Sequence, residues 1–87
     1  MPFPLGTIVA TPGALELAAQ GLELNAYQRR HLHGDWGDLD ESDKAENDFA
    51  LASGFRLLSS YNTPFGTLWI ITEHDRSATT FLTPDEY

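Results

Sequence analysis

The change of hydrophobic period at Gly54 constrains the fold of this chain more than any other feature. Before it, apolar residues recur at helical spacing; after it, the segments 55–62, 67–72 and 78–83 follow a period of two, as strands do. The turn sequence TPFG and the polar segment EHDRS separate these three segments. Because connections this short join antiparallel neighbours, the C-terminal part is predicted to form a three-stranded antiparallel meander.

The segment before Gly54 is predicted to hold three helices. Thr11 and Pro12 are typical of a helix start, and Gly21 is typical of a helix end. A second helix is predicted from Asn25, within a capping box, to Gly34. The expected apolar stripe of the first helix comprises Leu15, Ala18, Ala19 and Leu22.

The third helix is predicted over about 41–53, with Asp40 as its N-cap and Gly54 as its C-cap. Its buried stripe is expected to comprise Ala45, Phe49 and Ala52. The segment 6–11 is rich in β-branched residues and is predicted as a short strand that can add to the sheet. The predicted fold is therefore a single α+β domain over 1–87, with three helices packed on an antiparallel meander.

Charge and composition exclude several functional classes. The formal net charge of −8 disfavours direct binding to nucleic acid or to anionic membranes, and makes a basic surface the natural charged partner. The absence of cysteine excludes disulfides, cysteine-based zinc sites and thiol nucleophiles. No glycine-rich nucleotide-binding motif is present, so no cofactor is predicted. The chain start lacks a basic, then apolar, export signal, and we expect a cytoplasmic protein.

An acidic run, HLHGDWGDLDESDKAEND over 31–48, holds seven of the thirteen acidic residues and a single lysine. Several of these carboxylates lie at the start of the third helix, where they stabilise the helix dipole. Together they are also predicted to form an electrostatic surface that binds a basic partner. Trp36 is either an anchor of this surface or, as is usual for tryptophan, a part of the core. The predicted partner-binding residues are Asp35, Trp36, Asp38, Asp40, Glu41, Asp43, Glu46 and Asp48.

The same run suggests a metal site as an alternative. His31, His33 and Asp35 match the start of the H-x-H-x-D-H pattern of metallo-β-lactamase-type hydrolases, in which Trp36 replaces the last histidine. On a helix, however, a spacing of two turns the histidines about 200° apart, and the helix dipole alone favours histidine at a helix end. No metal ligand is therefore assigned, and a metal-dependent hydrolase is the alternative function.

The segments GTIVATPGALE, GDWGDLDESDKAEND, GFRLLSSY and LWIITEHDRSATTFLTPDEY resemble a family of small proteins found on plasmids and other mobile elements. Its members are often labelled "type I restriction endonuclease subunit M". A modification subunit needs a large fold for S-adenosylmethionine and an N-P-P-[FY]-type motif, and this chain has neither. The resemblance does imply mobile DNA that contends with host defences.

These observations lead to one expected function and two alternatives. The expected function is a non-enzymatic inhibitor of a host defence complex, of an anti-restriction or anti-CRISPR type. Its acidic surface would occupy a basic protein surface or a nucleoprotein complex of the host. The first alternative is the hydrolase above. The second is an accessory protein of replication or conjugation that binds a basic partner without inhibiting it.

Overall fold

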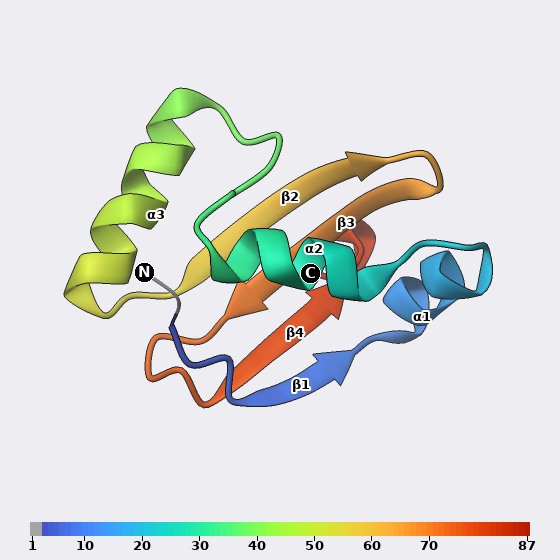
Figure 1. Ribbon diagram of the computed structural model, residues 1–87, viewed down its shortest axis with the longest axis horizontal. Helices are drawn as coiled ribbons and strands as arrows, with labels where there is room; N and C mark the ends of the chain where they lie inside the picture. Colours follow the sequence, from blue (N-terminus) through green and yellow to red (C-terminus); the bar gives the residue numbers. More distant parts are fainter. Residues whose placement is uncertain (1–2) are drawn as a thin grey trace.

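A computed structural model describes residues 3–87, so the first two residues of the predicted domain lie outside the described part. The described residues form an α+β fold of three α-helices, a four-stranded sheet and a C-terminal 3₁₀ helix (Figure 1). No helix within 3–87 is long and apolar enough to span a membrane. The elements are β1 (Thr7–Ala10), α1 (Pro12–Ala19), α2 (Leu24–Leu32), α3 (Glu41–Ser53), β2 (Leu57–Thr63), β3 (Gly66–Thr72), β4 (Ala78–Leu82) and η1 (Pro84–Glu86).

The predicted meander is confirmed. The strand order is β1-β4-β3-β2, and both β2–β3 and β3–β4 are antiparallel. The N-terminal strand β1 joins the sheet beside β4, in parallel orientation, and forms one edge (Figure 1). The other edge is β2, which lies next to α3. The sheet is thus mixed, because one parallel strand adds to three antiparallel ones.

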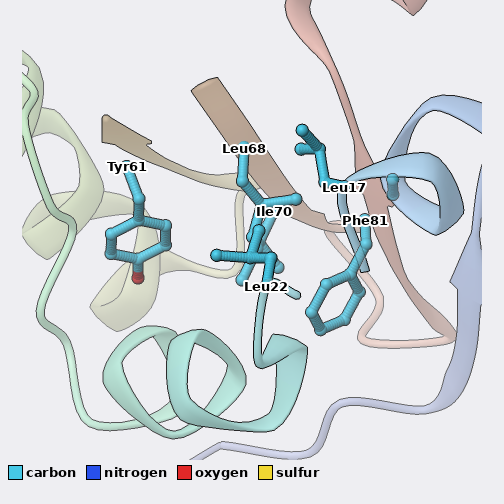
Figure 2. Packing of buried hydrophobic residues seen from close by; sticks show 7 residues of the cluster. Leu17, Leu22, Tyr61, Leu68, Ile70 and Phe81 are labelled. Carbon is cyan, nitrogen blue, oxygen red and sulfur yellow. The ribbon is translucent and has the colours of Figure 1, made fainter. Parts of the chain in front are cut away.

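The larger core lies between the sheet and helices α1 and α2. Leu17 and Leu22 pack against strand side chains that point to the helical side of the sheet, and Figure 2 shows this contact at close range. The strand members of this cluster are Tyr61, Leu68, Ile70 and Phe81. A smaller cluster, made by Phe3, Trp36, Ala50 and Leu57, attaches α3. Helix α3 therefore lies beside the β2 edge, whereas α1 and α2 lie on the sheet face.

Local capping explains where the helices begin and end. The Thr11 hydroxyl accepts a hydrogen bond from the Ala14 amide, and the Asp40 carboxylate accepts one from the Asp43 amide, as predicted. Helix α3 ends at Gly54, whose φ is +80°, as predicted. The capping box at Asn25 is wrong: α2 begins at Leu24, and its N-cap makes no side-chain hydrogen bond.

The predicted apolar stripe of α1 is confirmed at Leu22, which is buried, and wrong at Leu15. Leu15 is 55% exposed, whereas Ala14 and Leu17 are buried. At the end of the helix the Leu22 amide donates to the Leu17 carbonyl, and this bond folds the chain back so that both leucines join the core. Helix α1 is consequently turned so that Leu17, and not Leu15, faces the sheet.

The predicted buried stripe of α3 is also wrong. Ala45, Phe49 and Ala52 are exposed, and Asn47 and Ala50 are the buried residues of this helix. The reason is polar: the Asn47 side chain hydrogen-bonds both the amide and the carbonyl of Leu58 on β2. These hydrogen bonds to the backbone of the edge strand set the orientation of α3. In this orientation the stripe of Ala45, Phe49 and Ala52 points to solvent.

Candidate interaction site on α3

The acidic run first serves to cover the free edge of β2. On an edge strand, every second residue directs its amide and carbonyl away from the sheet. The Ser60 amide donates to the Trp36 carbonyl over 3.1 Å, and the Ser60 carbonyl accepts from the Asp38 amide. The Asp38 carboxylate accepts from the Asn62 amide over 2.8 Å. Residues 36–38 form an isolated bridge with β2 at Gly37 and Ser60, and they act as a substitute strand that blocks pairing with another chain.

Asn47 completes this cover at Leu58, which gives a test of its role. Asn47→Ala is expected to lower the free energy of unfolding by about 2 kcal/mol, because it leaves two half-buried backbone groups of Leu58 on β2 without partners. Urea denaturation measures the change. The matched control is Asn25→Ala on the exposed start of α2, which should change stability by less than about 0.5 kcal/mol. Equal losses in both variants would show that the Asn47 bonds contribute nothing specific.

Most carboxylates of the predicted surface already have intramolecular partners. Asp35 pairs with the Arg30 guanidinium over 2.7 Å, and this contact lowers the pKa of the Asp35 carboxyl. Asp40 caps α3, and Glu41 lies 3.8 Å from the Lys44 ammonium. Asp48 accepts a hydrogen bond from the Trp36 indole over 2.9 Å. Together with Asp38, which accepts a hydrogen bond from β2, five of the seven carboxylates therefore have a partner within the chain.

The acidic run does not form a single face. Glu46 and Asp48 are two positions apart on α3, so they project about 200° apart around the helix axis. Glu46 lies on the side that meets the start of β2, and Asp48 lies on the side of Trp36. The eight predicted residues are thus distributed over the strand edge and two sides of a helix, and their role in partner binding remains a prediction.

Trp36 is buried, which agrees with its placement in the core and not with a role as an exposed anchor. Its side chain is 3% exposed and packs in the smaller core cluster. The ring lies 5.6 Å from His31 and 6.4 Å from Phe3, measured between ring centroids. Its indole N–H donates to the Asp48 carboxylate. Burial follows because the substitute strand directs this side chain inward while its backbone pairs with β2.

Asp43 and Glu46 differ from the other carboxylates of the predicted acidic surface. Within the described chain, 3–87, neither side chain accepts a hydrogen bond or pairs with a basic group. Both line a groove of about 510 Å³ between α3 and the start of β2. We call this the α3 groove; it is lined by Leu39, Asp43, Glu46, Asn47, Phe49, Ala50, Phe55, Arg56 and Leu58.

Two exposed aromatic rings form part of the α3 groove. Phe49 is 64% exposed and Phe55 is 56% exposed, and their rings stack with centroids 6.0 Å apart and planes 20° apart. Sequence reasoning missed this pair because it placed Phe49 in the core. A signal was present: the two phenylalanines flank Gly54, which ends α3 and turns the chain back toward β2.

The three predicted metal ligands are not brought together. His31 is fully buried, its Nδ1 lies 2.6 Å from the Ser59 hydroxyl, and its Nε2 lies 2.9 Å from the Thr72 hydroxyl. His33 is exposed at the end of α2, and Asp35 pairs with Arg30. Among residues 3–87 no group of three or more histidine, aspartate or glutamate side chains is placed to hold a metal ion.

His31 instead belongs to a buried chain of hydrogen bonds whose direction is defined. The Thr79 hydroxyl donates to the Leu5 carbonyl, so it must accept from Thr72, and Thr72 must accept from His31 Nε2. Burial favours the neutral imidazole, and with the proton on Nε2 its Nδ1 accepts from the Ser59 hydroxyl. Burial, helped by the charge of Arg76, lowers the pKa of His31 to about 4.

The groups that line the α3 groove include two carboxylates, a guanidinium, an amide and two aromatic rings, without hydroxyl, thiol or imidazole. Such groups bind charged and apolar side chains. Comparison of the chain with protein-family models, with curated proteins and with solved structures found no match.

Proposed function

We propose that this protein is a non-enzymatic interaction protein that binds a basic protein surface through the α3 groove and its rim. The observation that carries the proposal is the pairing of two unpartnered carboxylates, Asp43 and Glu46, with the exposed Phe49–Phe55 stack. Protein interfaces combine an apolar centre with a polar rim, and aromatic residues at the centre contribute most of their binding energy.

The charge of the chain supports a basic partner. The formal net charge is −8, and α3 carries four acidic residues against a single lysine. Such a surface attracts a positively charged partner during encounter and repels nucleic acid and other anions. Association is therefore expected to slow as salt concentration rises, because exposed charges are screened beyond about 10 Å at 0.1 M ionic strength.

The resemblance to small proteins of mobile elements gives this partner a setting. A protein that helps mobile DNA against host defences needs to reach the nucleic-acid-binding parts of a defence complex, and those parts are basic. We accordingly propose that the partner is a basic channel or surface of such a complex, and that binding inhibits it. The acidic rim supports the proposal that the partner is positively charged. The resemblance supports the proposal that it belongs to a host defence complex.

Charge reversal tests the proposal. The double variant Asp43→Lys/Glu46→Lys is expected to lose at least about tenfold in affinity for the host partner, because it turns rim attraction into repulsion. The control, Glu16→Lys/Glu23→Lys, makes the same change in net charge at two exposed carboxylates outside the α3 groove and should stay within about twofold.

The measurement has two steps. Affinity purification from the native host with mass spectrometry identifies proteins that bind the wild type and the control but not the α3 variant. Binding of each recovered protein is then measured with purified components at several salt concentrations. Equal affinity of both double variants would contradict a role for the α3 groove, and affinity independent of salt would contradict the charge-based mechanism.

A further inference from the structure

We infer that the α3 groove receives an arginine side chain of the basic partner. This inference rests on the proposed function and deepens it, since it names the group that the site recognises. A basic partner presents both lysine and arginine, which differ in shape, hydration and stacking behaviour. The groove offers three kinds of contact, and each of them corresponds to one part of an arginine side chain.

The first contact is apolar. Leu39, Ala50 and Leu58 line the α3 groove, and all three are buried or half-buried, so they form its inner wall. A long basic side chain buries its methylene stem along such a wall while its charged head stays near water. The volume of the groove, about 510 Å³, exceeds that of one side chain.

The second contact is aromatic. Phe49 and Phe55 both line the α3 groove, and more than half of each side chain is exposed. A guanidinium is planar and weakly hydrated, so it stacks on aromatic rings, whereas the ammonium of lysine is compact and strongly hydrated. The Phe49–Phe55 stack gives the α3 groove an aromatic contact that the carboxylates of α3 do not offer by themselves. This contact favours arginine over lysine.

The third contact is ionic. Asp43 and Glu46 are three positions apart on α3, so their carboxylates lie on the same side of the helix. Both are unpartnered within the described chain, and carboxylates form paired hydrogen bonds with the two edges of a guanidinium. The basic residue that also lines the groove, Arg56, donates to the Tyr87 hydroxyl and lies 5.4 Å from the centre of its ring. Its charged end is therefore already engaged.

The same observations argue against other occupants. An added β-strand is excluded because Trp36, Asp38 and Asn47 already bond the outward groups of β2. An anion would meet two carboxylates against the single guanidinium of Arg56. A purely apolar side chain would cover Phe49 and Phe55 but would leave Asp43 and Glu46 partly desolvated without a partner, which costs free energy.

The probe is a short peptide with one central arginine among glycine and serine, together with versions that carry lysine or citrulline at that position. Each peptide is titrated into ¹⁵N-labelled protein, and NMR shifts report both affinity and place. The arginine peptide is expected to shift resonances of α3 and the start of β2, and to bind about fivefold more tightly than the lysine peptide. Citrulline is planar but uncharged and should not bind measurably.

Removal of one aromatic wall separates this inference from the proposed function. Phe55→Ala keeps every charge, so it should retain weak binding of both cationic peptides but lose the preference for arginine. The control is Phe65→Ala, which removes an exposed phenylalanine in the β2–β3 turn and should keep the preference. The dispersion of the NMR spectra shows whether each variant is folded.

Each outcome of the titrations decides between the two proposals. Preference for arginine that Phe55→Ala abolishes supports both of them. Equal binding of the arginine and lysine peptides overturns the inference and leaves the charge-based function standing. No binding of either cationic peptide at α3 overturns both. Shifts at the groove when the protein alone is concentrated would identify a second copy as the occupant and would also overturn the inference.

Discussion

Gly37→Ala is expected to destabilise the protein by about 3 kcal/mol, because the added methyl group has no room and the backbone conformation is unfavourable for alanine. Gly37 has a φ of +81°, and a Cβ at this position would overlap the Ser60 carbonyl oxygen and lie 2.6 Å from Cδ1 of Tyr61. Both contacts are with β2, at the point where Gly37 forms a bridge with Ser60. The substitution therefore pushes the substitute strand off the sheet edge.

Gly54→Ala is the matched control. Gly54 has nearly the same backbone conformation, with φ of +80°, but no heavy atom lies within 4 Å of an added Cβ. Its substitution should cost only the left-handed strain, about 1 kcal/mol. Urea denaturation of both variants measures the difference, which isolates the close approach of Gly37 to β2. Equal losses would mean that the strand edge tolerates the methyl group and that the cover of β2 is loose.

The second large effect is a loss of stability on mild acidification. His31 is neutral in the folded protein, where burial lowers its pKa to about 4, whereas its ordinary value is 6.5. Between these values the unfolded chain binds a proton that the folded protein does not. The contribution of neutral His31 is thus fully present above about pH 6.5 and is lost as the pH falls toward 4, by roughly 3 kcal/mol in total.

Two histidine variants test this assignment. His31→Gln cannot titrate, so it should be less stable than the wild type at pH 7 but should lose the dependence of stability on pH between 5 and 7. His33→Gln removes an exposed histidine of the same helix end and should keep the wild-type dependence. Chemical denaturation across this range is the measurement, because the lowered pKa values of Asp35 and Glu86 place their titration below it. A wild-type slope in His31→Gln would refute the role of His31.

The sequence predicted the elements well where the signals were local. The ends of α3 follow from Asp40 and Gly54, each of which acts on groups within four residues of itself. The meander follows from period and turn length, which are also local properties. The parallel pairing of β1 with β4 was not predicted, because it joins segments about seventy residues apart that share no turn.

The candidate site was predicted only in part. Asp43 and Glu46 belong to the predicted acidic surface, and they line the α3 groove. Phe49 was assigned to the core because its spacing from Ala45 and Ala52 is that of a buried stripe, and periodicity says which residues share a face but not which face is covered. The sequence left Trp36 open between anchor and core, because its burial depends on the pairing of its backbone with β2.

By itself, then, the sequence determined the helices, the meander and the strongly acidic charge of the chain. The helices and the meander depend on hydrophobic spacing, capping and turn length, and the charge depends on composition. Tertiary structure alone decided the orientation of α3, the identity of the carboxylates without partners, and the burial of His31. Each of these depends on a hydrogen bond to a distant residue: Asn47 to Leu58, Asp48 to Trp36, and His31 to Ser59 and Thr72. A buried polar group must find a partner wherever the fold places one, and this requirement turned the apolar stripe of α3 toward solvent.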